Sequence, residues 1–124
     1  MPAALIIDDD VEVRHLIKSF LERLKIDSEQ ASNGIEGIKK TKDNKYYIIF
    51  LDYKMPKLDG EQFIKVLRKR DVDIPVIIIS GYLTKENIEK MSSLGVKGFL
   101  SKPIHFQRFC EEVNKVYPIE IPKE

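Results

Sequence analysis

Four apolar runs of the sequence end in polar side chains that a buried strand does not need. Two of the runs end in carboxylates, at Asp8 and Asp9 and at Asp52, and the other two end in a hydroxyl and an ammonium, at Ser80 and Lys102. Burying a carboxylate is costly unless a cation or hydrogen-bond donors compensate it. These side chains therefore either solvate the strand ends or are held there to react.

The chemistry that uses this set of groups is phosphoryl transfer onto a carboxylate. Asp8, Asp9 and Asp52 repel each other when crowded, which favours a proton or a hard cation among them. A site made of oxygen ligands suits Mg²⁺, which keeps several waters and bridges to phosphate. Asp52 would act as the nucleophile, with Lys102 and Ser80 contacting phosphoryl oxygens.

Each signal is weak by itself. Acidic residues after strands commonly solvate loops or cap helices, and Asp10 is expected to be such a cap. A serine after a strand is usually a turn or cap residue, and Lys-Pro is a common dipeptide. Their joint occurrence at the ends of four strands of one sheet favours a site.

Hydrophobic periodicity indicates alternating strands and helices. Short apolar runs predict strands near 3–7, 46–51, 74–80 and 97–101, with a more polar edge strand at 26–32. Helical spacing predicts helices near 13–24, 34–43, 59–67, 84–94 and 104–116. Asn33 with Glu36 and Asp59 with Gln62 resemble capping boxes at the start of two of them. The alternation predicts an α/β fold, a doubly wound five-stranded parallel sheet with five helices on both faces.

Composition sets further limits. The 124 residues fit one domain, and the net charge of +1 gives no indication of nucleic-acid binding. The longest apolar runs are far shorter than a membrane span, and the early acidic residues do not resemble a signal peptide. The single cysteine, Cys110, suits a reducing compartment. We therefore expect a cytoplasmic protein.

Four motifs resemble the receiver domain of response regulators in two-component signalling. "LIIDDD" resembles the acidic-pair motif of that family, and "LDYKMPKLDG" its phosphoacceptor loop, while "IIISGY" and "GFLSKP" resemble the segments with the switch hydroxyl and the lysine. The match covers residues 3–117 of what would be a single receiver domain over 1–124, with a loose tail at 118–124. The resemblance implies the flavodoxin-like strand order 2-1-3-4-5 and a cis Lys102–Pro103 bond.

The resemblance also implies roles for individual residues. Asp52 would be the phosphoacceptor, and Mg²⁺ would be held by Asp9, Asp52 and the backbone carbonyl of Lys54, with Asp8 holding a metal-bound water. Ser80 and Phe99 would form the switch, in which the hydroxyl moves toward the phosphoryl group and the aromatic ring fills the space.

The implied function is a phosphorylatable signalling switch rather than an enzyme. A histidine kinase or histidine phosphotransfer protein would donate the phosphoryl group, and loss of that group would be slow and self-catalysed. An output domain or protein would read the face made by the fourth helix, last strand and last helix. Neither nucleic acid nor a membrane is an expected direct partner.

Two features make this sequence distinct within the family pattern. Long side chains, Lys54 and Tyr82, occupy the positions that flank the approach of water to the phosphoryl group, which predicts a long-lived phosphorylated state. Lys97-Gly98 stands where receivers that dimerise through the switch face carry an acidic pair. We therefore expect mostly monomer.

Two other functions remain open at this stage. A pseudo-receiver would use only its surface to bind partners, although such proteins usually lack part of the acidic and lysine set. A phosphatase of the haloacid-dehalogenase type also uses a strand-end aspartate with Mg²⁺. That family needs a second aspartate two residues after the nucleophile, where this chain has Lys54.

Overall fold

The computed structural model describes residues 3–55, 57–70 and 72–119. Its strands are β1 (Ala4–Ile7), β2 (Ser28–Ala31), β3 (Ile48–Asp52), β4 (Val76–Ser80) and β5 (Gly98–Ser101). Its helices are α1 (Val11–Arg23), α2 (Gly34–Asp43), α3 (Gly60–Lys69), α4 (Lys85–Ser93) and α5 (Phe106–Val116). Strands and helices alternate along the chain, as the periodicity predicts.

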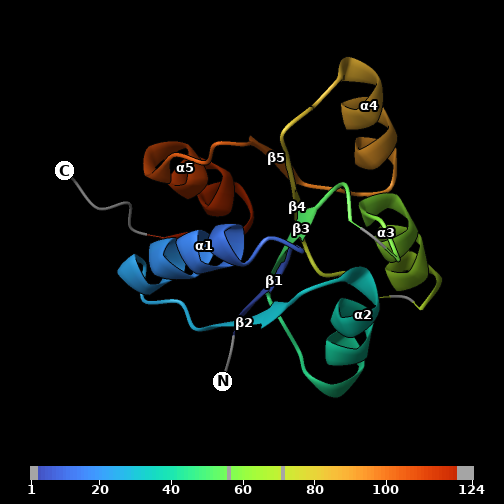
Figure 1. The fold of residues 1–124 in the computed structure, drawn as a ribbon, viewed down its shortest axis with the longest axis horizontal. Coiled ribbons are helices and arrows are strands. Elements are labelled where there is room, and N and C mark those ends of the chain that lie inside the picture. The colour runs from blue at the N-terminus through green and yellow to red at the C-terminus, as the bar shows by residue number, and fades with distance from the viewer. Residues whose placement is uncertain (1–2, 56, 71, 120–124) are drawn as a thin grey trace.

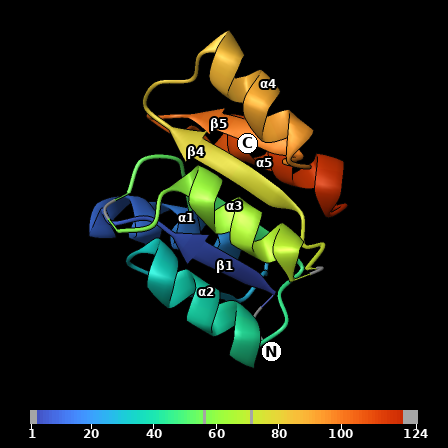
Figure 2. The same cartoon turned by 90° about the vertical axis from the view of Figure 1, so that its right-hand side faces the viewer.

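The strands form one parallel sheet in the order β2-β1-β3-β4-β5. Helices α1 and α5 cover one face, and α2, α3 and α4 lie on the other (Figures 1 and 2). The predicted fold class and strand order are therefore confirmed. The chain runs from β1 outward to β2 on one side and to β3 on the other, so the strand order reverses between β1 and β3. Open sheets of this class bind ligands beyond the carboxyl ends of the strands at such a point.

The sheet is buried on both sides, which explains why three of its strands are apolar throughout. Every residue of β1, β3 and β4 is buried. One core cluster lies under α1 and α5 and includes Phe20, Phe50 and Phe109, and a second lies under the other helices and includes Phe63 and Met91. Parallel sheets covered on both faces favour such continuous apolar strands over alternating ones.

Side-chain caps begin four of the helices. Asp10, Asn33, Asp59 and Thr84 each accept a hydrogen bond from a backbone N–H in the first turn of the helix that follows. At α3 the predicted capping box is complete, because Gln62 also accepts from the N–H of Asp59. At α2 only half of the predicted box forms, since Glu36 accepts from the Ser32 hydroxyl instead.

The predicted boundaries differ clearly from the observed ones at the edge strand. The expected strand at 26–32 is shorter in the structure, where β2 spans Ser28–Ala31 and Lys25 before it adopts a left-handed backbone (φ 59°). Residues 120–124, most of the expected tail, lie outside the described residues. Among the described helices, none combines the length and the apolar character that crossing a membrane needs.

A close approach between α2 and the loop after β3 gives a stability prediction. A Cβ atom on Gly34 would lie 2.5 Å from the backbone oxygen of Leu58, which cannot move without displacing the loop that follows Asp52. We expect Gly34→Ala to lower the free energy of unfolding by about 2 kcal/mol through overpacking. Urea denaturation measures the change.

Gly81→Ala is the matched control, because no heavy atom lies within 4 Å of the Cβ that it would add. An unfolding free energy of Gly34→Ala equal to that of the parent protein would show that the two segments are not in tight contact.

Candidate functional site

Strand register brings the predicted carboxylates together. Ile7 of β1 pairs with Leu51 of β3, so the next residues, Asp8 and Asp52, leave the sheet side by side. On the other side of Asp52, β4 pairs with β5 up to Ser80 and Ser101, and Lys102 comes next. Because all strands are parallel, these positions share one edge of the sheet.

The alternation of side chains along the strands also selects which of these groups face each other. Ile6, Phe50 and Leu100 all belong to the core cluster beneath α1 and α5. Asp8, Asp52 and Lys102 each lie two residues later, so a strand period of two directs them to that same side. In β4, Ile79 faces the cluster beneath α1 and α5, so the next residue, Ser80, points to the opposite side of the sheet. Its hydroxyl therefore has different contacts from the carboxylates.

The Lys102 ammonium lies between two buried carboxylates. Its Nζ is 3.1 Å from Asp8 Oδ2 and 3.5 Å from Asp52 Oδ1. Asp8 is fully buried and Asp52 is 5% exposed, so water contributes little to the stabilisation of either charge. The Lys102–Pro103 peptide bond is cis, as expected. One cation thus serves two carboxylates that cannot be solvated well.

Burial and mutual repulsion shift the pKa of both groups. Desolvation raises the pKa of Asp8, and desolvation together with the charge of Asp8 raises the pKa of Asp52 to about 7. Desolvation also opposes the charge on Lys102, but Asp52 and Asp8 outweigh it and raise the pKa of the ammonium. The carboxylates are therefore under-compensated by the protein alone, and a further cation would stabilise their ionised forms.

The geometry fits a hard metal ion. Oxygen atoms of Asp8, Asp9 and Asp52 lie within 4.8 Å of one another, and Asp9 is exposed while the other two are buried. Asp8 Oδ2 is buried without a hydrogen bond, although it forms the ion pair with Lys102. An all-oxygen set with an open side and an unsatisfied buried acceptor suits Mg²⁺, which retains several waters. A cluster of this kind is typical of a Mg²⁺ site.

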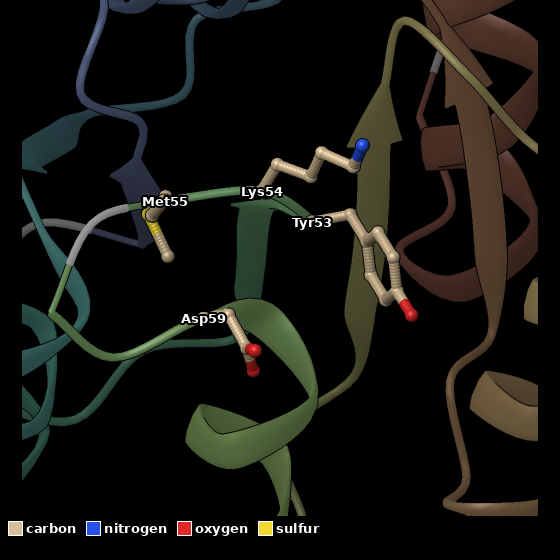
Figure 3. Close-up of a pocket in the computed structure, with 4 residues that line it drawn as sticks. All are labelled: Tyr53, Lys54, Met55 and Asp59. Atoms are coloured by element: carbon tan, nitrogen blue, oxygen red, sulfur yellow. The ribbon is translucent and has the colours of Figure 1, made fainter.

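The loop after Asp52 places Lys54 at the exposed side of the strand end. A hollow of about 460 Å³ beside this loop is lined by Tyr53, Lys54, Met55 and Asp59. In Figure 3 the Lys54 side chain extends away from Met55 and Asp59. The Tyr53 hydroxyl donates to Asn87 Oδ1 of α4 at 3.3 Å, so the residue after Asp52 contacts a helix of the predicted output face.

Among the described residues, neither predicted switch side chain forms a hydrogen bond with the carboxylates. Ser80 is buried, and its hydroxyl donates to the carbonyl of Tyr82 and accepts from the Tyr82 N–H. The Tyr82 side chain is 68% exposed. Phe99 is half-buried in β5 and packs against the core cluster under α3 and α4. The hydroxyl is thus turned into the loop after β4.

Sequence reasoning missed two polar residues that support this edge. Glu112 of α5 is buried, accepts a hydrogen bond from the Phe99 N–H, and pairs with Arg108 and Lys115. The basic residues four before and three after Glu112 were a readable signal for such a cluster. Arg14 of α1 donates to the carbonyl of Asp8, and nothing in the local sequence indicates that contact.

The family model and the similar curated proteins both assign the chain to the same family. Residues 4–114 match the family model described as the response regulator receiver domain. The chain is 32% identical over 113 residues to the probable C4-dicarboxylate response regulator DctR of Bacillus subtilis, covering 90% of this chain and 50% of that protein. It spans half or less of the length of the curated relatives that it matches.

Solved structures agree in fold. The Francisella response regulator 1452 receiver domain superposes with a TM-score of 0.87 at 34% identity, covering 94% of this chain and 97% of that one. The response regulator TrrA of Thermotoga maritima, in complex with Mg²⁺ and BeF, gives a TM-score of 0.82 at 28% identity, with 94% and 99% covered. With its acidic pocket of Asp8, Asp9 and Asp52, the chain belongs to the response regulator receiver domain family of two-component signalling.

Proposed function

We propose that this chain is a phosphorylatable switch in which Asp52 accepts a phosphoryl group from a histidine kinase or histidine phosphotransfer protein. One observation carries the proposal. The oxygens of Asp8, Asp9 and Asp52 converge within 4.8 Å at a sheet edge, with the Lys102 ammonium beside Asp8 and Asp52. A structural role alone does not call for so much uncompensated charge in one buried place.

The transfer needs only positioning and charge from the protein. A carboxylate oxygen of Asp52 attacks the phosphorus of the partner's phosphohistidine, the new P–O bond forms as the P–N bond breaks, and the imidazole nitrogen keeps the electron pair and takes a proton. Lys102 pairs with a phosphoryl oxygen. The chain is therefore a self-catalysed acceptor rather than an enzyme that turns over a substrate.

Mg²⁺ fits the acidic cluster as the cofactor. Asp9, Asp52 and the backbone carbonyl of Lys54 would hold the ion, and Asp8 would hold one of its waters. When bound, Mg²⁺ supplies positive charge that offsets the repulsion between the carboxylates and the incoming phosphoryl oxygens. The similar TrrA was solved in complex with Mg²⁺ and BeF, which supports Mg²⁺ as the cofactor.

The switch would start from the contacts of Ser80. Its hydroxyl now bonds the backbone of Tyr82 on both sides, and an exchange of those bonds for a phosphoryl oxygen would pull in the loop before α4. Phe99 would then pack into the vacated space. Because it is Phe, it has no phenol to bond a partner or the loop, so the signal rests on packing.

The output face would be α4-β5-α5, read by an output domain or protein in the cytoplasm. Direct binding to nucleic acid or to a membrane is not part of the proposal. A pseudo-receiver that binds partners without phosphate is the alternative that the first experiment below distinguishes.

Phosphorylation is the first prediction. Incubation with acetyl phosphate or phosphoramidate and Mg²⁺ should add one phosphoryl group to the intact protein, as measured by mass spectrometry. Asp52→Asn should abolish the label, because the amide cannot act as the nucleophile, and removal of Mg²⁺ with a chelator should suppress it.

Asp43→Asn, which changes an exposed carboxylate at the end of α2, is the control and should label normally. Unlabelled parent protein would favour the pseudo-receiver, and a labelled Asp52→Asn would place the acceptor elsewhere.

The lifetime of the phosphoryl group is the second prediction. Hydrolysis needs water in line with the P–O bond, and Lys54 and Tyr82 would flank that approach. We expect Lys54→Asn and Tyr82→Ala each to speed the loss of phosphoryl several-fold at fixed Mg²⁺, followed by mass spectrometry over time. If both variants lose it at the parent rate, neither side chain shields the group.

The oligomeric state is the third prediction. A Cβ at Gly98 would lie 2.9 Å from Glu112 Oε1, so a side chain there would have to displace the end of the Glu112 side chain. The acidic pair of receivers that dimerise through this face is absent here, because Lys97-Gly98 occupies its place. Sedimentation should show mostly monomer with and without beryllofluoride and Mg²⁺. A tight dimer that appears with beryllofluoride and is lost on substitution in β5 would disprove this expectation.

A further inference from the structure

Arg14 links α1 to β2 and to Asp8, the residue that follows β1. Its Nη1 donates to the backbone carbonyl of Asp8 at 2.7 Å, and its Nε donates to Gln30 Oε1 on β2 at 3.0 Å. The side chain is half-buried, and the guanidinium is a rigid, planar set of donors. It therefore fixes two acceptors on adjacent strands relative to each other.

The contact occurs where the sheet ladder stops. β1 and β2 pair up to Ile7 and Ala31, and the Asp8 N–H still donates to the carbonyl of Ala31. β2 then ends, and the Asp8 carbonyl accepts its hydrogen bond from Arg14. The guanidinium thus takes the place of a further strand residue and holds the peptide plane that joins Asp8 to Asp9.

The two residues of the acidic pair depend on that peptide plane to different degrees. The Asp8 carboxylate is also held by the Asp10 N–H at 2.9 Å and by Lys102. The Asp9 carboxylate, by contrast, has no hydrogen bond or ion pair among the described residues. Its direction is therefore set by its backbone, and the peptide bond that leads into it carries the carbonyl that Arg14 holds.

We propose that Arg14 is a positioning residue for the metal site, which holds the Asp8–Asp9 peptide so that the Asp9 carboxylate faces Asp8 and Asp52. The inference rests on the proposed function, since it assumes that Mg²⁺ binds to these carboxylates. Arg14 acts through the backbone of Asp8 and touches neither the ion nor the phosphoryl group.

A purely electrostatic role for Arg14 predicts the opposite result. A cation close to the site repels Mg²⁺, so a variant without the charge would bind the ion more tightly if charge alone mattered. A positioning role predicts weaker Mg²⁺ binding when the two hydrogen bonds of the Arg14 guanidinium are lost, whether or not the substituted side chain keeps a positive charge. The sign of the change in affinity therefore separates the two.

The experiment compares Arg14→Gln, Arg14→Lys and Gln30→Ala with the parent protein. Mg²⁺ is titrated into uniformly ¹⁵N-labelled protein, and its affinity is read from the amide signals of Asp9, Asp10 and Tyr53. We expect Arg14→Gln to bind Mg²⁺ roughly tenfold more weakly, as is usual when a group that orients a metal ligand is removed.

Arg14→Lys keeps the charge but has a single donor nitrogen, which cannot replace both the Nε bond to Gln30 and the Nη1 bond to the Asp8 carbonyl. It should weaken binding by a smaller factor, and Gln30→Ala should do the same, because it releases only the Nε side. Lys18→Gln removes an exposed charge from the same helix and is the control, with the parent affinity expected.

Two further readouts separate positioning from general damage to the fold. In the metal-free protein, Arg14→Gln should shift the amide signals of Asp9 and Asp10 while leaving those of α5 unchanged. Urea denaturation establishes that the variants are folded under the titration conditions. An Arg14→Gln variant that is folded and binds Mg²⁺ as tightly as the parent, or more tightly, overturns the inference.

Failure of the proposed function gives a different result. If the parent protein shows no saturable response to Mg²⁺ at these amides, the metal site itself is wrong. If the parent binds Mg²⁺ and takes up a phosphoryl group while the Arg14 variants match it, only the positioning role is wrong.

Discussion

The rest of the structure depends on the free-energy cost of holding two buried carboxylates side by side at the edge of a sheet. Asp8 and Asp52 are both buried, and one ammonium, Lys102, is shared between them. Desolvation and mutual repulsion outweigh that ammonium, which is why the pKa values of both carboxyl groups are raised. The protein therefore holds an unfavourable charge distribution that a further cation can relieve.

The fold provides the rigidity that this arrangement needs. The continuous apolar residues of β1 and β3 lock the strands in register, so Asp8 and Asp52 cannot move apart to reduce their repulsion. The surrounding contacts tie the edge to elements on both faces. Tyr53 reaches α4, Arg14 comes from α1, and Glu112 of α5 binds the backbone of β5. Hydrogen bonds thus connect this edge of the sheet to helices on both of its faces.

The sequence predicted the fold well because its main signals are local. Buried parallel strands appear in the sequence as short apolar runs, and helix caps such as Asp59 with Gln62 can be recognised from their spacing alone. The convergence of Asp8, Asp9, Asp52 and Lys102 also followed, because parallel strands place their ends at one edge. Arg14 and Glu112 were missed as supporting residues, since their partners are backbone groups on distant strands and only tertiary packing selects those. The hydroxyl of Ser80 also faces Tyr82, a rotamer that sequence does not specify.

The measurement that tests the central claim most directly is the urea unfolding of the parent protein and Asp52→Asn at pH 8, without and with Mg²⁺. The folded-state pKa of Asp52 is raised from 3.8 to about 7, so ionisation of Asp52 lowers stability progressively between these two pH values, and the full cost is present at pH 8; the amide carries no such cost. Without metal, Asp52→Asn should be more stable than the parent by about 1 kcal/mol or more. Mg²⁺ should stabilise the parent and have a much smaller effect on the variant. A variant less stable than the metal-free parent, together with no effect of Mg²⁺ on the parent, would contradict the account.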